Sequence, residues 1–301
     1  MDAKRNFRAY AALLSSMLVW GFSFLATKHV IAVAPIFSLL FVRFLLAALL
    51  LGGVVWHRRA FRLPKRELWI LAGLSALSPV GYFLFETYGV ALTQPSHVAV
   101  LIATIPIAVY LIAFARRQER ARWQKTLGIS IAYLGAILMI GFGQSEEGAT
   151  LVGDLLVLGA VVCAAVRTSL IKDALTRVTP LQLTFYQFLF SLVVFGPLAA
   201  TDGFSWVSNL TPLTVLEILF LGVLCSAAAF LAMHYALSHL AATQVAVSAN
   251  LVPVVTLLAE ATILGSLLTL PKVGGTVLVI VGVILTQIAT RPDRTNVPIE
   301  G

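Results

Sequence analysis

Apolar runs of about 20 residues, the length that crosses a bilayer as a helix, follow one another along almost the whole chain. Only 11% of the residues are charged and 59% are hydrophobic, whereas soluble domains carry about 25% charged residues. The pattern therefore predicts an all-α polytopic membrane protein with ten transmembrane helices. The predicted helices cover residues 10–32, 36–55, 68–91, 96–115, 124–142, 151–171, 181–200, 213–237, 243–266 and 271–290.

The basic residues predict how the helices are oriented. With the N-terminus in the cytoplasm, all but four of the 21 Lys and Arg residues fall at cytoplasmic ends of helices, as expected for a membrane protein. The four others are Lys28, Arg43, Arg167 and Lys272. We therefore expect both termini to be cytoplasmic, in a bacterial inner membrane. The basic start leads into a run from Tyr10 that is longer than a signal-peptide core, which predicts a retained first helix.

The second half of the chain repeats the first. VAV occurs at residues 98–100 and 245–247, each followed by a proline within the apolar run, Pro106 and Pro253. A proline inside a helix removes a hydrogen bond and bends the helix. Because each half has five predicted helices, an odd number, the halves must enter the membrane in opposite senses. We predict two inverted five-helix repeats, residues 1–143 and 144–301, with a pathway between them.

Several of these motifs together resemble the EamA-type members of the drug/metabolite transporter superfamily. They include VWGFSF at residues 19–24, the stretch that ends in FVR at Arg43, and the Ala-Leu pairs that close helices 3 and 8. Pro106, Pro253 and the series Glu119, Gly128 and Gly135 fit as well, although Ser266 stands where the second half would repeat Glu119. The resemblance covers nearly the whole chain and implies export of small solutes.

Charged residues inside the first half are candidates for a substrate site, because charge is costly within a membrane. Lys28, Arg43 and Glu86 share a predicted depth of roughly 7–12 Å from the outer boundary, at 1.5 Å per residue. Lys28 or Arg43 would hold a substrate carboxylate, and Glu86 an ammonium group or a proton. The alternatives are a structural ion pair between Arg43 and Glu86, and a Lys28 side chain that reaches the interface.

The second half offers candidates nearer the cytoplasm. Arg167 lies too deep in its helix to reach the interface easily, which favours a functional role. His234 is either a proton carrier or a packing residue. Gln244 and Asn250 would hydrogen-bond a substrate or join helices. Glu260, in the outer half of its helix, would titrate or cap a neighbouring helix.

Three aromatic residues share helix faces with the charges. Trp20 and Phe24 precede Lys28 at helical spacing, and Tyr82 precedes Glu86. They would form an aromatic wall for an amphipathic solute, or pack against helices and lipid. The glycines and alanines of helices 5 and 10 are better explained as packing contacts, within one chain or between two.

Other classes of function lack their motifs. The chain has no phosphate-binding GxxxxGK[ST], HExxH or GxSxG motif, and its two cysteines form no CxxC pair. We expect no catalytic residues, no cofactor and no metal. The net charge of +8 is divided among short loops rather than gathered for nucleic acid.

The sequence thus predicts a monomeric carrier in the lipid bilayer that exports small organic metabolites, amino acids or related zwitterions, by alternating access. Proton coupling would rest on Glu86, Glu260 and His234. Efflux of lipophilic cations or drugs is the alternative within transport. An intramembrane enzyme or a lipid-handling protein is the alternative from another class, and it would need clustered catalytic groups.

Overall fold

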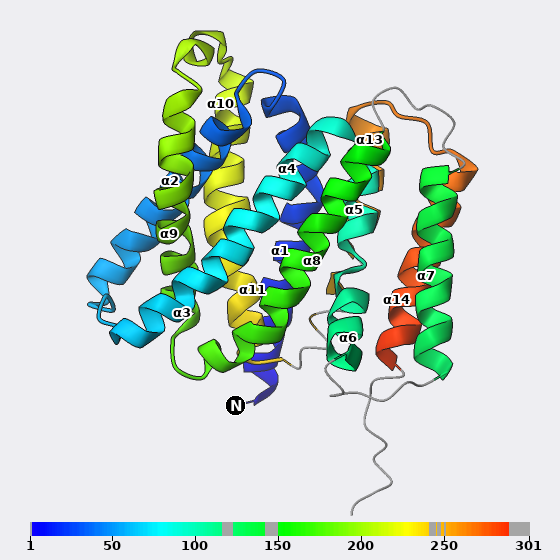
Figure 1. Ribbon diagram of the computed structural model, residues 1–301, viewed down its shortest axis with the longest axis horizontal. Helices are drawn as coiled ribbons and strands as arrows, with labels where there is room; N and C mark the ends of the chain where they lie inside the picture. The colour runs from blue at the N-terminus through cyan, green and yellow to red at the C-terminus, as the bar shows by residue number, and fades with distance from the viewer. Residues whose placement is uncertain are drawn as a thin grey trace, which may run out of the picture.

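The computed structural model describes residues 2–115, 123–141, 150–240, 245, 248–249 and 251–288. Within these ranges the chain forms helices and turns and no strand (Figure 1). In chain order the elements are α1 (Asp2–Val30), α2 (Ile36–His57), α3 (Lys65–Ser75), the π-helical η1 (Ala76–Gly81), α4 (Tyr82–Leu92), α5 (Pro95–Ile102), α6 (Ile105–Ala115), α7 (Trp123–Gly141), α8 (Leu151–Leu175), α9 (Pro180–Thr201), the short η2 (Ser205–Asn209), α10 (Pro212–Leu219), the π-helical η3 (Phe220–Ala228), α11 (Ala229–Leu237), α13 (Leu251–Ile263) and α14 (Leu270–Ile288).

Seven helical stretches in the described part of the chain are long and apolar enough to cross a membrane. Shorter apolar helices lie at Leu251–Ile263 and Leu270–Leu285. Large apolar side chains also cover the outside of the bundle, and Trp69 and Val193, for example, are 79% and 72% exposed. A surface of this kind is stable only against hydrocarbon. The prediction of an all-helical, multi-pass membrane protein is confirmed.

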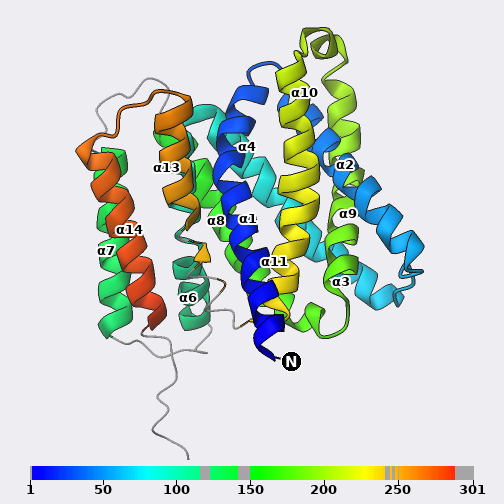
Figure 2. The ribbon, with the colours of Figure 1, turned by 180° about the vertical axis from the view of Figure 1, so that it is seen from behind.

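The helices pair in a regular pattern. α1 lies between α11 and α13 (Figure 2), while α8 packs on α4 and on α5 and α6. α2 packs on α9, and α7 on α14. Every described helix from α1 to α7 thus packs against at least one helix between α8 and α14.

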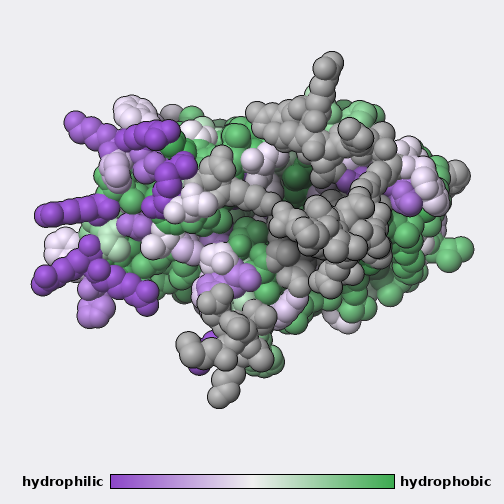
Figure 3. Space-filling view, turned by 90° about the horizontal axis from the view of Figure 1, so that it is seen from below, coloured by the Kyte–Doolittle hydropathy of each residue, from purple (hydrophilic) through white to green (hydrophobic). Residues whose placement is uncertain are grey.

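Basic side chains gather at the end of the bundle where the N-terminus lies. The link between α2 and α3 reaches this end (Figure 1), and Figure 3 shows its hydrophilic residues at the left edge of the face seen from below. The exposed basic residues here are Arg58, Arg59 and Arg62 of the link and Lys65 and Arg66 at the start of α3.

The two prolines begin helices instead of bending them. The helix expected at residues 96–115 is interrupted by a turn at Ala103 and Thr104, so that Pro106 is the second residue of α6. Pro253 is the third residue of α13. A proline fits the first turn of a helix because the N–H that it lacks would have no partner there.

Small residues bring α7 and α14 into close contact. A Cβ atom added to Gly135 would lie 2.7 Å from the carbonyl oxygen of Gly275, and one added to Gly282 would lie 2.4 Å from the backbone nitrogen of Ala132. The predicted small faces of helices 5 and 10 therefore pack against each other within one chain.

We predict that Gly282→Ala lowers the melting temperature of the purified protein, because the added methyl group forces α7 and α14 apart. Gly274→Ala is the matched control in the same helix, since its Cβ would meet only Leu138 Cδ2, at 3.7 Å. Alanine favours a helix by up to about 1 kcal/mol over glycine, so the control keeps or raises the melting temperature. Equal melting temperatures for the two variants would contradict this packing.

Candidate functional site

Lys28 is held by the end of a neighbouring helix. Its Nζ donates to the carbonyl oxygens of Val90, Ala91 and Thr93, at 2.8, 3.0 and 2.9 Å. These carbonyl groups belong to the C-terminal end of α4, where helix carbonyls have no partner within the helix. All three N–H groups of the ammonium are therefore engaged. Lys28 therefore caps α4. Its ammonium group does not extend to the membrane interface, and it has no N–H left to donate to a ligand.

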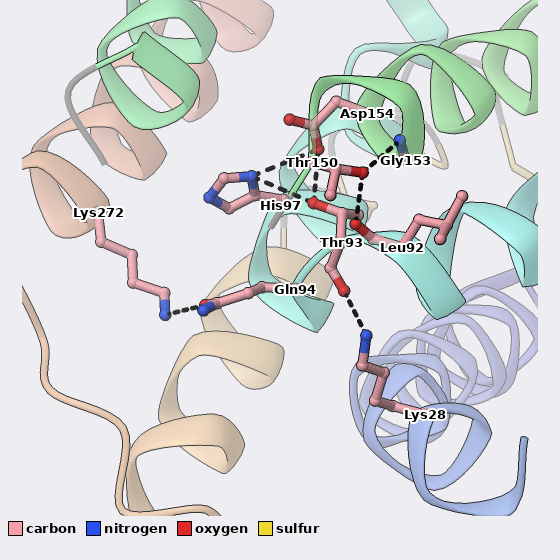
Figure 4. A network of polar contacts seen from close by, with 9 residues as sticks. All are labelled: Lys28, Leu92, Thr93, Gln94, His97, Thr150, Gly153, Asp154 and Lys272. Carbon is pink, nitrogen blue, oxygen red and sulfur yellow. Dashed lines mark hydrogen bonds and ion pairs between the residues drawn. The ribbon is translucent and has the colours of Figure 1, made fainter. Parts of the chain in front are cut away.

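Further polar residues lie at the junction of α4 and α5 (Figure 4). We name them, with Lys28 and Glu260, the junction network; they are Thr93, Gln94, His97, Asp154 and Lys272. Asp154 Oδ1 accepts a hydrogen bond from Thr93 Oγ1 at 2.8 Å and lies 3.3 Å from His97 Nδ1. Lys272 Nζ donates to Gln94 Oε1 at 2.9 Å and forms an ion pair with Glu260 Oε2, also at 2.9 Å. These contacts join α5 to α8, α13 and α14. Glu260, expected to titrate or to cap a helix, instead pairs with Lys272.

Arg43 on α2 is 2% exposed and differs from these paired groups. Its Nε donates to Ser226 Oγ at 3.0 Å, and its guanidinium lies 4.4 Å from the centre of the Phe83 ring. Ser226, in η3, donates its own hydrogen bond to the carbonyl oxygen of Leu221 at 2.8 Å. Among the described residues, no carboxylate oxygen lies within 4.0 Å of the Arg43 guanidinium. The charge is supported by the ring faces of Phe83 and Phe44 and by the Ser226 hydroxyl group.

Glu86 is a buried carboxylate that interacts electrostatically with Arg43. It is 3% exposed, its Oε2 accepts a hydrogen bond from Thr87 Oγ1 at 3.1 Å, and its charge acts on Arg43 and on Tyr82. The direct ion pair between Arg43 and Glu86, which the sequence left open as an alternative, does not form. Arg43 turns instead toward Phe83 and Ser226. Two opposite charges thus lie near each other, buried and not joined.

Aromatic rings line this region. Trp20 Nε1 donates to the carbonyl oxygen of Cys225 at 3.0 Å, and its ring lies 5.1 Å from that of Phe230. Phe230 also meets Phe83 and Phe188, at 5.9 and 5.5 Å. Of the aromatic wall predicted from the sequence, Trp20 and Tyr82 lie here. Phe24 lies in the apolar cluster around Val98 and Leu101, against which Trp20 also packs.

A second buried cation lies beyond Phe230. Arg167 on α8 is 9% exposed, and its Nη2 lies 2.7 Å from Gln187 Oε1 and 3.2 Å from His234 Nε2. Thr184 Oγ1 is 2.8 Å from His234 Nδ1. We name Arg167, Thr184, Gln187 and His234 the Arg167 cluster. The structure thus brings together Arg167 and His234, two of the residues singled out from the sequence.

Several site residues were missed from the sequence. Ser226, Thr184 and Gln187 are polar residues inside apolar runs, and the helical spacing of Thr184 and Gln187 was a signal that could have revealed them. Phe83 and Phe230 gave no signal, because many phenylalanines occur in these runs. Gln244 and Asn250 lie outside the described residues, so their predicted roles stay predictions.

The buried charges and the lipid-facing surface define a class: a multi-pass helical membrane protein with polar groups held in its interior. Comparison with known sequences then gives the family. The profile of the EamA-like transporter family matches residues 7–141 and again 151–288. The chain belongs to this family, within the drug/metabolite transporter superfamily, and is a transporter rather than an enzyme.

Individual relatives agree with this assignment. An "Uncharacterized transporter" of Archaeoglobus fulgidus is 30% identical over 254 residues, which cover 83% of this chain and 87% of that protein. A Salmonella typhimurium protein named "Probable amino-acid metabolite efflux pump" is 25% identical, and the match covers 98% of each chain. A crystal structure with 16% identity matches the fold with a TM-score of 0.69, over 96% of this chain and 98% of that one.

The position of Lys28 leads to a prediction about stability. Lys28→Met removes the cap from three carbonyl groups, and hydrogen bonds to a charged group contribute roughly 1.5–3 kcal/mol. We expect the variant to unfold at a lower temperature in detergent and to keep the substrate affinity of the unchanged protein. Lys65→Met, at an exposed position, serves as the control. An unchanged melting temperature with weakened substrate binding would show that Lys28 contacts the substrate.

Proposed function

We propose that the protein is a secondary transporter of a bacterial inner membrane that exports amino acids or related zwitterions by alternating access. The observation that carries the proposal is the relation between Arg43 and Glu86. Both side chains are buried and interact electrostatically with each other, and they form no ion pair. A zwitterion placed between them would offer its carboxylate to Arg43 and its ammonium group to Glu86.

The energetics of burial favour this ligand. A charge inside a membrane protein is costly unless it is paired and hydrogen-bonded. Direct contact would satisfy Arg43 and Glu86, yet Arg43 lies against Phe83 and Ser226 instead. A zwitterion adds one charge of each sign and leaves the net charge of the site unchanged. Trp20, Tyr82 and Phe83 would contact the apolar part of an amphipathic solute.

The packing of the helices supports an inverted-repeat carrier. We propose ten transmembrane helices in two repeats, residues 1–143 and 144–301, with both termini in the cytoplasm. The regular pairing of helices and the two successive matches to the family support the repeats, and the basic residues at the end that holds the N-terminus support the orientation. A monomer is sufficient, because the small faces of α7 and α14 meet within one chain.

The junction network suggests which end is shut. It lies at the end opposite the N-terminus, where α1 ends and α8 begins (Figure 1). The Thr93–Asp154 and Gln94–Lys272 hydrogen bonds join helices from both proposed repeats, and the Lys272–Glu260 ion pair joins two helices of the second. In this account the network closes the outer end, and its contacts separate when the repeats exchange conformations.

Efflux of lipophilic cations is a second candidate, and one observation favours it. Glu86 is a buried carboxylate without an ion-pair partner among the described residues, as an organic cation would require. This alternative gives Arg43 no role in binding. The two candidates therefore differ in their response to the loss of Arg43.

Counterflow in proteoliposomes tests the proposal. Liposomes loaded with one unlabelled amino acid at a time should accumulate labelled tracer when the amino acid is a substrate. Arg43→Met should lower exchange at least about tenfold, because a charge-assisted contact of roughly 1.5–3 kcal/mol is lost. Arg66→Met, at an exposed position, is the control. No exchange of any amino acid by folded protein, or full exchange by Arg43→Met, would contradict the proposal.

We further propose that a proton competes with the substrate for Glu86. Of the three residues expected to carry protons, His234 has both ring nitrogens in hydrogen bonds and Glu260 is paired with Lys272. We therefore assign the proton to the third, Glu86. Export would then be driven by an inward proton gradient. We expect Glu86→Gln to abolish the stimulation of net flux by an imposed pH gradient. Gradient-driven flux that persists in Glu86→Gln would exclude this role.

A further inference from the structure

The Arg167 cluster has no part in the zwitterion site described above. Ser226, which contacts Arg43, and His234, which contacts Arg167, are eight residues apart on one continuous helical stretch. At 1.5 Å per residue the two positions are about 12 Å apart. Phe230, midway between them, packs on both Phe83 and His234. The two arginines thus contact positions about two helical turns apart on this stretch, so the second arginine needs an explanation of its own.

The hydrogen bonds of the cluster fix the protonation of His234. Thr184 Oγ1 has one proton, which it donates to the carbonyl oxygen of Pro180 at 2.6 Å. The hydroxyl oxygen therefore accepts from His234 Nδ1–H at 2.8 Å. His234 Nε2 is then unprotonated and accepts from Arg167 Nη2 at 3.2 Å. His234 is neutral, and a second proton on it would face the Arg167 guanidinium, the charged group that acts on it.

Two buried donors of the cluster have no acceptor among the residues that the structure describes. They are Arg167 Nε and Gln187 Nε2. Nε is two bonds from the Nη2 atom that donates to Gln187, and Nε2 is two bonds from the Oε1 atom that accepts. The free donors therefore flank the same hydrogen bond. A buried donor without an acceptor costs about 1–3 kcal/mol, so an acceptor that bridges the two would be bound favourably.

The charge of the cluster selects the acceptor. Arg167 is its one charged member, and within the described residues no carboxylate oxygen lies within 4.0 Å of it. One positive charge with two free donors matches a monoanion with two oxygens, which is the chemistry of a carboxylate. A phosphate dianion would bring an extra negative charge without a partner into the apolar interior.

We propose that Arg167 and Gln187 bind the carboxylate group of the transported solute, with neutral His234 holding the guanidinium in place. The proposal rests on the proposed transport of carboxylate-bearing solutes. It adds a second binding position on the transport path, at Arg167 and Gln187, which we call the station. His234 and Arg167 lie closer than Ser226 and Arg43 to the end that holds the N-terminus, because α11 runs toward that end (Figure 2). The solute would bind at Arg167 first and move past Phe230 to Arg43 and Glu86.

Calorimetric titration of the purified protein in detergent tests the station. The probe is 4-methylpentanoate, which has a carboxylate and no ammonium group, and 3-methylbutylamine is its counterpart without a carboxylate. We expect the carboxylate to bind and the affinity to fall at least tenfold in Arg167→Met. The control Arg66→Met, at an exposed position, should keep the affinity. Equal affinity in Arg167→Met, or stronger binding of the amine or of inorganic phosphate, would overturn the proposal.

Gln187→Glu keeps the test decisive if Arg167→Met does not fold. The new carboxylate would pair with Arg167 within the chain, so the variant should fold and lose binding of 4-methylpentanoate. Unchanged binding by folded Gln187→Glu would refute the station. If this binding holds while no amino acid is exchanged in counterflow, the proposed function fails and the carboxylate site remains. If exchange occurs while the titrations show no role for Arg167, the station fails alone.

Discussion

The cost of burying charge among apolar helices is the constraint that organises this protein. A charge in such a place needs a partner of opposite sign or several hydrogen bonds. Lys28 is satisfied by three carbonyl oxygens, Asp154 by Thr93 and His97, and Lys272 by Glu260. These groups join helices. Arg43 and Arg167 lack such a carboxylate partner among the described residues, and they are the groups that we assign to the solute.

Aromatic ring faces explain how Arg43 can remain without a carboxylate partner. Phe83 presents its face to Arg43, and Phe230 packs on Phe83, Phe188 and Trp20. Ring faces stabilise a cation while leaving its donors partly free. The π-helical η3 contributes the Cys225 carbonyl group to Trp20 and the Ser226 hydroxyl to Arg43. Such segments often occur at functional sites.

The sequence predicted the class of fold well, because hydrocarbon imposes length and apolarity on each helix. It also singled out Arg43, Glu86, Arg167 and His234, since a charged or titratable residue stands out in an apolar run. It could not predict that Lys28 caps α4, or that Arg43 would avoid Glu86, because both depend on contacts between distant helices. Gln187 and Thr184 were missed because an uncharged polar residue stands out less in an apolar run than a charged one does. The sequence also could not predict the turn at Ala103 and Thr104, because a proline bends a helix or begins one depending on the helical turn that it occupies.

The most direct test of the central claim is a cryo-electron microscopy map of the protein with a bound amino acid that it exchanges. The account predicts a ligand carboxylate within hydrogen-bond distance of Arg43 and a ligand ammonium group at Glu86, with the two side chains still apart. A map in which Arg43 and Glu86 pair directly, while the ligand touches neither, would contradict it.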